Sequence, residues 1–380
     1  MNTDVDVAVV GGGIIGLGIA WEAIRRGHSV ALIDPDPAGG ATHAAAGMIA
    51  PASELHYREE HLLRLTVDSA SRYPEFLFSL AWTGVDPGYR RTGTLVLALD
   101  GADRTALADL QTVQQRNSLS VQQIPLREAR RSEPLIGPAA TAAFHAPDDH
   151  QLDPRRLAQA LIAAVSERGR LVRRRASGIE RTGNRVTGVS LEDGTFVGAR
   201  HTVVANGLAA ADLAGLPCQL PLRPVYGDIL RLRVPEALQP LLTHTIRGLV
   251  RGHAVYLVPR EDGTVVLGAT MREDGSSAVS AGGVYQLLRD AQQLIPAVAE
   301  LELVEVLCRA RPGTPDNAPL LGGVTGTHNL VIATGFFRHG VLLTPAAAAL
   351  CVDLLEGKPG PAEQERYKPD RFEEGRAWRS

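Results

Sequence analysis

The sequence predicts an α/β fold in which a doubly wound domain is interrupted by an inserted domain built on an antiparallel sheet. The first observation is a run at residues 5–10, apolar except for Asp6, that leads directly into a glycine-rich turn. The second is a change after Pro217, where the predicted strands have the alternating or β-branched content of an antiparallel sheet. The third is a return at residues 330–333 to a continuously apolar strand, as in a buried parallel sheet. The first domain is therefore assembled from segments that lie far apart in the chain.

The glycine turn has the spacing of a βαβ unit that binds a dinucleotide. Gly11 makes the tight turn after the first strand, and Gly13 lets the backbone approach a phosphate. Gly16 lets the following helix, residues 14–27, pack close to the sheet. The free amides and the dipole of this helix then face a pyrophosphate.

A second predicted strand, residues 28–33, ends at an acidic residue, Asp34. This placement lets the carboxylate hold two ribose hydroxyl groups. A 2′-phosphate would require an arginine here, so the acid favours FAD or NAD over NADP. A helix-capping turn without a ligand leaves the three glycines and the acid unexplained, and we therefore predict an adenine dinucleotide.

Periodicity and turn signals predict the elements that follow. Helix 153–168 is the most firmly marked, because Asp153 is a capping residue and Pro154 occupies the first turn. The other elements expected before Pro217 are helices at 54–80, 103–116 and 126–132 and strands at 93–98, 186–191, 195–197 and 202–205. Those expected after it are strands at 229–234, 254–258, 265–269 and 330–333 and helices at 283–294 and 345–355.

These elements divide the chain into two expected domains. The nucleotide-binding domain takes residues 1–85, 146–217 and 311–368, and the substrate-binding domain takes residues 86–145 and 218–310.

Composition narrows the class of protein. The net charge is −3 over 380 residues, so no global basic field attracts nucleic acid or an anionic membrane. The three cysteines (218, 308 and 351) lack metal-type spacing, which fits a reduced, cytoplasmic protein without a metal. The first strand begins so close to Met1 that we expect no signal peptide. We also expect no membrane-spanning helix, because Pro345 and Asp353 interrupt the alanine-rich segment near residue 346.

Two late segments narrow the chemistry. One is the run RPGTPDNAP at 311–319, and the other is the run ATGFFRHGVLLTP at 333–345. The second predicts a strand, a glycine turn and a helix N-terminus with free amides. Such a terminus suits the electron-rich edge of a reduced flavin ring, where negative charge develops.

Together with GGGIIG at 11–16 and HAAAGM at 43–48, these segments resemble the FAD-dependent amine oxidases of the D-amino-acid oxidase family. The similarity runs nearly from end to end and is strongest to the glycine-oxidising members, which supply an imine for the thiazole of thiamine. The resemblance implies contacts to FAD, beyond the turn glycines, from Ile14, Ile15, Asp34, Pro35, Ala41, Thr42, Ala46, Gly47, Met48, Ala176, Phe336, Phe337, Arg338, His339, Gly340, Val341 and Leu342.

The resemblance also implies a substrate site. Arg311 clamps the substrate carboxylate, with Arg338 nearby, while Tyr256 and Met271 wall a pocket for small amino acids. A bidentate arginine–carboxylate pair fixes the orientation that removal of a hydrogen from Cα requires, and a tyrosine hydroxyl adds a second contact. Oxygen is the expected acceptor of the electrons, with hydrogen peroxide formed.

Three departures from the family pattern bear on these expectations. Phe336 stands where glycine oxidases often carry His, and His339 where they often carry Asn; we expect His43 and His339 to be solvated loop residues. The run VYGD at 225–228 differs from the commoner family pattern, in which a basic residue is followed by Gly and then by Gln or Glu. Cys308 is one residue out of register with the cysteine that attaches flavin in related sarcosine oxidases, so we expect non-covalent FAD.

The alternatives are a D-amino-acid or sarcosine-type oxidase or dehydrogenase and, from another class, a flavin-binding subunit without turnover. The preferred amine, the electron acceptor and the oligomeric state, including a homo-oligomer, stay open.

Overall fold

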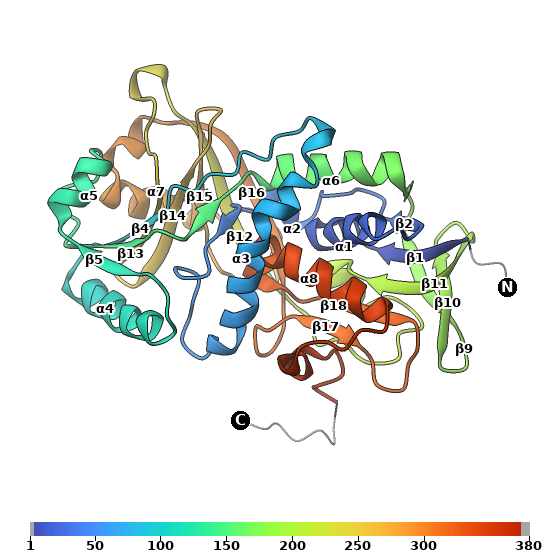
Figure 1. The fold of residues 1–380 in the computed structure, drawn as a ribbon. Coiled ribbons are helices and arrows are strands. Elements are labelled where there is room, and N and C mark those ends of the chain that lie inside the picture. Colours follow the sequence, from blue (N-terminus) through green and yellow to red (C-terminus); the bar gives the residue numbers. More distant parts are fainter. Residues whose placement is uncertain (1–3, 374–380) are drawn as a thin grey trace.

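The computed structural model describes residues 4–373, which form two eight-stranded sheets lying side by side (Figure 1). The first sheet contains β1 Val5–Val10, β2 Val30–Ile33, β8 Arg170–Val172, β9 Ala176–Thr182, β10 Arg185–Leu191, β11 Phe196–Val204, β17 Leu320–Gly323 and β18 Leu330–Thr334. The second contains β4 Thr94–Ala98, β5 Gln122–Ile124, β6 Ala142–Ala146, β12 Arg223–Arg233, β13 Thr245–Val250, β14 His253–Pro259, β15 Thr264–Gly268 and β16 Glu302–Gly313. A small pair, β3 Met48–Ile49 with β7 His150–Gln151, is separate.

Eight α-helices accompany these strands in the described part of the chain. They are α1 Ile14–Arg25, α2 Ala41–Ala44, α3 Leu63–Phe78, α4 Gly101–Arg116, α5 Leu126–Ser132, α6 Pro154–Arg168, α7 Ala281–Leu294 and α8 Gly340–Leu355. The predicted cap of α6 is confirmed, because the Asp153 side chain accepts a hydrogen bond from the Arg155 amide at 2.8 Å.

The first sheet has the predicted parallel centre. β1 pairs in parallel with β2 and β11, and β11 pairs in parallel with β18. Val7 and Val9 of β1 pack in the core that holds α1, α6 and α8, whereas Ala8 and Val10 pack in the core on the other face. Because side chains alternate along a strand, a strand buried on both faces is continuously apolar, as β1 is from Val7 to Val10. The second face is covered mainly by β9, β10 and the segment after β11.

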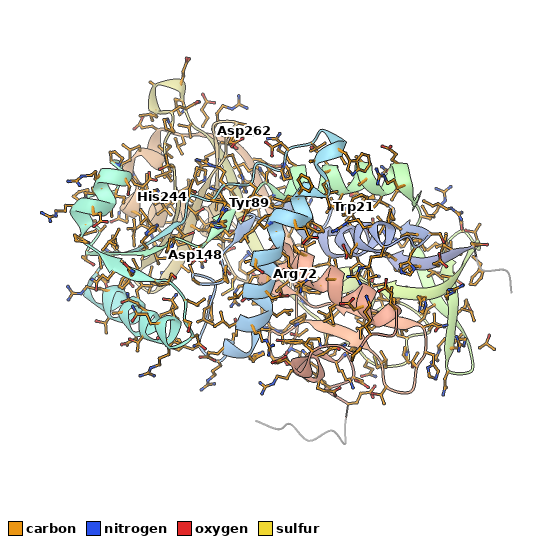
Figure 2. All side chains as sticks on the ribbon, in the orientation of Figure 1. Trp21, Arg72, Tyr89, Asp148, His244 and Asp262 are labelled. Atoms are coloured by element: carbon orange, nitrogen blue, oxygen red, sulfur yellow. The ribbon has the colours of Figure 1, made fainter. Side chains whose placement is uncertain are left out.

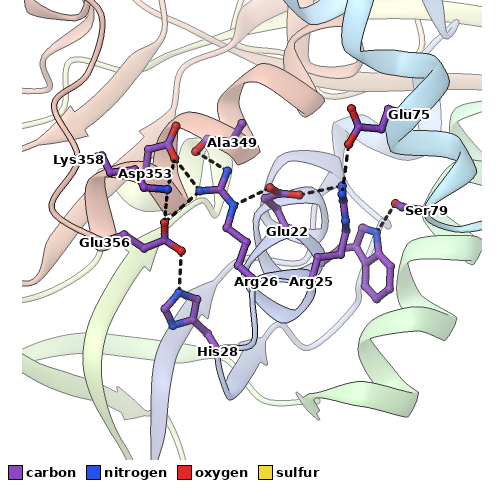
Figure 3. Close-up of polar contacts among 11 residues, drawn as sticks. Glu22, Arg25, Arg26, His28, Glu75, Ser79, Ala349, Asp353, Glu356 and Lys358 are labelled. Carbon is purple, nitrogen blue, oxygen red and sulfur yellow. Dashed lines mark hydrogen bonds and ion pairs between the residues drawn. The ribbon is translucent and has the colours of Figure 1, made fainter.

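Helices α1 and α8 lie side by side in the same direction (Figure 1). Their C-terminal ends are joined by Arg26, whose guanidinium binds Glu22 at 2.8 Å, Asp353 at 2.6 Å and Glu356 at 3.2 Å (Figure 3). Trp21 of α1 is buried beside them (Figure 2). This packing aligns the two helix N-termini, which both point back toward the junction of the two sheets.

The expectation that Pro345 interrupts the last apolar segment is wrong. The helix begins at Gly340 and continues through Pro345, its sixth residue. Proline has no N–H to donate to the carbonyl oxygen of Val341, and that oxygen accepts a hydrogen bond from the Tyr73 hydroxyl instead. By length and composition alone, residues 337–355 could cross a membrane, but 72% of that window is buried inside the fold. α8 has the position of a core helix, packed against α1 and α3.

The second sheet is antiparallel, as predicted, except that β4 and β13 pair in parallel. α7 covers one face, where Leu287, Ala291 and Leu294 enter the core with Val255 and Leu257. The other face of this sheet packs against α4 at one end and against the nucleotide-binding domain at the other. Since β16 continues to Gly313, Arg311 lies on this sheet. We propose the two domains as predicted, with Arg311 moved to the substrate-binding side.

Candidate active site

A cavity of about 460 Å³ lies between the two sheets, at the N-termini of α1 and α8. It brings together most residues that the sequence analysis singled out, namely Gly13, Ile14, Ile15, Asp34, Ala41, Thr42, Ala46, Gly47, Met48, Tyr256, Met271, Arg311, Phe336, Phe337, Arg338, His339, Gly340, Val341 and Leu342. Four others, Gly11, Gly16, Pro35 and Ala176, are not in its lining.

The turn glycines outside the lining have packing roles. Gly11 has a φ of +106°, and a Cβ there would lie 2.5 Å from the backbone of Asn206. A Cβ at Gly16 would lie 1.9 Å from the carbonyl oxygen of Gly11, so only glycine allows α1 to start this close to the turn.

Gly13, which does line the cavity, has a different role. A Cβ at Gly13 would meet nothing nearer than the Thr42 hydroxyl at 3.7 Å. Gly13 therefore leaves open space where a phosphate can approach.

Asp34 and Thr42 order the nucleotide end of the cavity. The two carboxylate oxygens of Asp34 accept hydrogen bonds from the amides of Gly12 at 2.6 Å and Asp36 at 2.7 Å. The Thr42 hydroxyl accepts one from the Ile14 amide at 2.9 Å. These contacts hold the carboxylate against the turn while it lines the cavity, in the place predicted for a ribose ligand.

The N-terminus of α8 closes the other wall of the cavity. His339, just before it, is buried, and burial together with the charge of Arg338 holds the pKa of His339 well below its usual range. The expectation of a solvated loop histidine is therefore wrong, because this side chain is neutral and enclosed. Its Nδ1 atom and the Oδ1 atom of Asn206 are buried without a hydrogen-bond partner inside residues 4–373. Both residues line the cavity.

Three arginines gather at the substrate end, and two of them already have carboxylate partners. Arg247 forms an ion pair with Glu54, and Arg338 forms ion pairs with Glu54 at 3.3 Å and with Glu59. Burial and the neighbouring Arg338 lower the pKa of Arg247 to about 10, so its guanidinium stays charged at neutral pH.

Arg311 is different, because it pairs with no carboxylate within the described residues. Its Nη1 atom donates only a long hydrogen bond, 3.3 Å, to the carbonyl oxygen of Thr270. Three guanidinium groups against the carboxylates of Glu54 and Glu59 leave one net positive charge. The guanidinium of Arg311 is half-buried, and a partly desolvated charge is stabilised by an opposite partner, so this end of the cavity suits an anionic ligand with one carboxylate.

Tyr256 lies beside Arg311, and the two side chains interact. Burial raises the pKa of the Tyr256 phenol, while the charges of Arg311 and Arg247 oppose that shift. The hydroxyl therefore stays protonated near neutral pH and can donate a hydrogen bond to a carboxylate. Met271 also lines the cavity, but 65% of its surface is exposed, so it forms the rim and leaves the interior less crowded than a buried wall would.

Two glycines make room for these side chains. A Cβ at Gly227 would lie 2.3 Å from Nη1 of Arg311, and a Cβ at Gly268 would lie 2.5 Å from the Tyr256 hydroxyl. Sequence reasoning named Gly227 only as part of the run VYGD, without a role, and did not single out Gly268, Arg247, Glu54 or Glu59. Only the pairing of distant strands shows which side chain each glycine faces, so no local signal in the sequence could have identified them.

Replacing Gly227 by alanine is expected to displace the Arg311 guanidinium without removing it. Because the clash falls on the far end of a side chain, the backbone is preserved. We expect kcat/KM for an amino-acid substrate to fall by about tenfold to hundredfold, corresponding to overpacking of roughly 1–3 kcal/mol. Steady-state kinetics beside Gly101→Ala, where the new Cβ meets nothing within 4 Å, provides the control. An unchanged kcat/KM would show that Arg311 tolerates the displacement.

Comparisons with known proteins agree with this geometry. The family model described as DAO, FAD dependent oxidoreductase, matches residues 6–354. The bifunctional protein ThiO/ThiG of Trichormus variabilis is 32% identical over 94% of this chain and 53% of its own length. This chain thus spans about half the length of that curated relative. The glycine oxidase of Geobacillus kaustophilus is 33% identical over 93% of each chain. Its crystal structure superposes with a TM-score of 0.90, covering 98% of this chain and 100% of that one.

Proposed function

Because the chain belongs to the DAO family of FAD-dependent oxidoreductases, we propose that it oxidises glycine, or a similarly small amine, to the imine. Oxygen then reoxidises the cofactor and yields hydrogen peroxide. The relatives named glycine oxidase and ThiO/ThiG support this substrate and a role in supplying iminoacetate for the thiazole of thiamine. A cytoplasmic location and a small amino acid as substrate belong to the same proposal.

The residues that line the cavity fit FAD. The glycine turn and the N-terminus of α1 suit a pyrophosphate, and Asp34 suits a ribose. Asn206 and His339 offer buried polar atoms without partners, and the N-terminus of α8 adds partial positive charge at the opposite wall. When bound, FAD accepts the two electrons and the hydrogen removed from the substrate.

The protein orients the substrate. We propose that Arg311 holds its carboxylate through two parallel N–H···O contacts and that the Tyr256 hydroxyl donates to the same group. Glu54 and Glu59 are occupied by ion pairs with arginines, so neither is free to act as a base. An amine that binds in its neutral form needs no base, and orientation is then the main contribution of the protein. The unpaired guanidinium of Arg311 is the observation on which this proposal rests.

Two other functions compete with it. A D-amino-acid or sarcosine-type oxidase or dehydrogenase would use the same carboxylate clamp. A flavin-binding subunit without turnover would have no use for Arg311 and Tyr256 facing an open cavity.

Anaerobic mixing with glycine tests the proposal. We expect bleaching of the flavin absorbance, and formation of peroxide when air is admitted. An amine panel that includes sarcosine and D-alanine ranks the substrates. Absence of bleaching with every amino acid would favour the non-catalytic subunit, and bleaching without peroxide would favour a dehydrogenase.

We expect the flavin to be held without a covalent bond. Cys308 is buried outside the cavity lining, and its Sγ atom is 3.3 Å from Nη2 of Arg272. Acid precipitation should release all yellow colour into the supernatant. Flavin retained in the pellet would contradict the prediction, and the same experiment on Cys308→Ser would then identify whether this thiol is the attachment site.

A further inference from the structure

A second cavity, of about 210 Å³, adjoins the first at its substrate end. Its lining comes from α4 and from strands of the second sheet. Figure 1 shows α4 beside these strands. Three residues, His56, Arg247 and Ala254, line both cavities. The two spaces therefore meet at this trio, which we call the junction.

One face of the second sheet forms a continuous floor under both spaces. Residues directly opposite each other on neighbouring strands point to the same face. Tyr256 is opposite Arg247, Arg247 is opposite Val96, and Val96 is opposite Phe144. Tyr256 lies in the first cavity, Arg247 at the junction, and Val96 and Phe144 in the second cavity. A ligand extended along this row of side chains passes from one space into the other.

On β14 the floor of the junction is a small residue, Ala254. Ala254 is exposed, and no larger side chain stands between Tyr256 and the second cavity on β14. Arg247 is held to one side by its ion pair with Glu54 and a 3.8 Å contact to the sulfur of Met48.

The second cavity is built mainly from apolar side chains. Leu107 and Leu110 of α4 form its roof, while Leu249, Val96 and Phe144 contribute from the sheet. Arg247, its one guanidinium, is already paired with Glu54. Such a space stabilises hydrocarbon and penalises a second unpaired charge.

We propose that the second cavity is a subsite for an apolar, unbranched substituent carried by the amine substrate, on its nitrogen or its α-carbon. This inference rests on the proposed function: Arg311 fixes the carboxylate, and the substituent extends past Ala254 beneath α4. The substrate range then reaches beyond glycine to amino acids with several additional methylene groups. Met271 at the rim does not impose the tight limit that the sequence suggested.

Two ligand series test the subsite on the flavin-bound protein. The first is acetate to hexanoate, which bind without turnover; their Kd comes from the change in flavin absorbance. The second measures kcat/KM for sarcosine to N-butylglycine beside D-alanine to D-norleucine. Burial of each methylene should improve Kd and kcat/KM by about fourfold until the cavity is full. If kcat/KM improves along the N-alkylglycines, the substituent is on nitrogen; if it improves along the D-amino acids, the substituent is on the α-carbon.

A substitution that fills the second cavity tests whether the gain with chain length arises there. Ala106 is exposed on α4 and lines only the second cavity, so Ala106→Phe should abolish the gain with chain length while kcat/KM for glycine is unchanged. Leu110→Trp, one turn along α4, repeats the test. Ala102→Phe is the matched control, because Ala102 is exposed on α4 and lines neither cavity.

The outcomes separate the subsite from the proposed function. Carboxylate affinity that is flat or weaker with chain length, or a gain that survives both filling variants, would overturn the subsite even if glycine is oxidised. Carboxylate affinity that tightens with chain length and collapses in Ala106→Phe supports the subsite even if glycine is not a substrate. In that case only the proposed oxidation of glycine fails.

Discussion

Arg311→Ala should lower kcat/KM for glycine by about thirtyfold to several thousandfold. Removing one partner of a desolvated charge pair costs about 2–5 kcal/mol, and roughly 1.4 kcal/mol corresponds to one decade in rate. The geometry supports a value inside this range, because Arg311 has no carboxylate of its own among residues 4–373 and its main contact is a long bond to a carbonyl. Arg311→Lys should recover only part of the loss, since an ammonium group lacks the planar fork.

The comparison that assigns the role uses two substrates. Glycine should lose far more kcat/KM than an amine without a carboxylate, and FAD binding should persist because the glycine turn lies at the other end of the cavity. Arg233→Ala, which removes an exposed arginine from β12, is the matched control. Equal losses for both substrates, or no loss for either, would contradict the carboxylate clamp.

Gly16→Ala should weaken FAD binding. The new Cβ would lie 1.9 Å from the carbonyl oxygen of Gly11, a backbone atom that cannot rotate away. α1 must then shift from the turn, and its amides move relative to the pyrophosphate. Overpacking of this kind costs roughly 1–3 kcal/mol, so we expect the Kd for FAD to rise by about tenfold to hundredfold.

Flavin fluorescence titration measures this Kd, and circular dichroism establishes whether the variant is folded. Gly101→Ala, at the open N-terminus of α4, should bind FAD like the unmodified protein. A folded Gly16→Ala protein with unchanged FAD affinity would show that the helix relaxes without cost at the phosphate site. An unfolded one would assign the close approach to stability rather than to the ligand.

The elements that could be predicted are those whose signals are local. β1 and α5 have the predicted bounds, because an apolar run or a helical period is complete within a few residues. β16 was not predicted as a strand of twelve residues, since it carries charged residues at Glu305, Arg309 and Arg311 and is only partly buried. It is held by pairing with β12, in which the partner residues are 69 to 90 positions away in the chain, and no window of sequence contains that information.

The residues of the candidate site also fall into two groups, those that a local motif identifies and those that only strand pairing or packing brings to the cavity. Arg311, Tyr256 and the turn from Phe336 to Leu342 were found through motifs and lie together at the cavity. Arg247 was not found, because its relation to Tyr256 depends on the register between β13 and β14. Glu54 was missed because it lies in a segment predicted to be part of a long helix, whereas helix begins only at Glu60. The burial of His339 also depends on packing that its own neighbourhood in sequence does not reveal.

In the second sheet, the side chains that line the cavity are different from the side chains that stabilise the fold. On β14, Ala254 and Tyr256 line the cavity, while the alternate residues Val255 and Leu257 pack in the core with α7. Alternation along a strand therefore assigns odd and even positions to different tasks. A library randomised only at the cavity-lining positions can therefore change the shape of the cavity with little loss of fold.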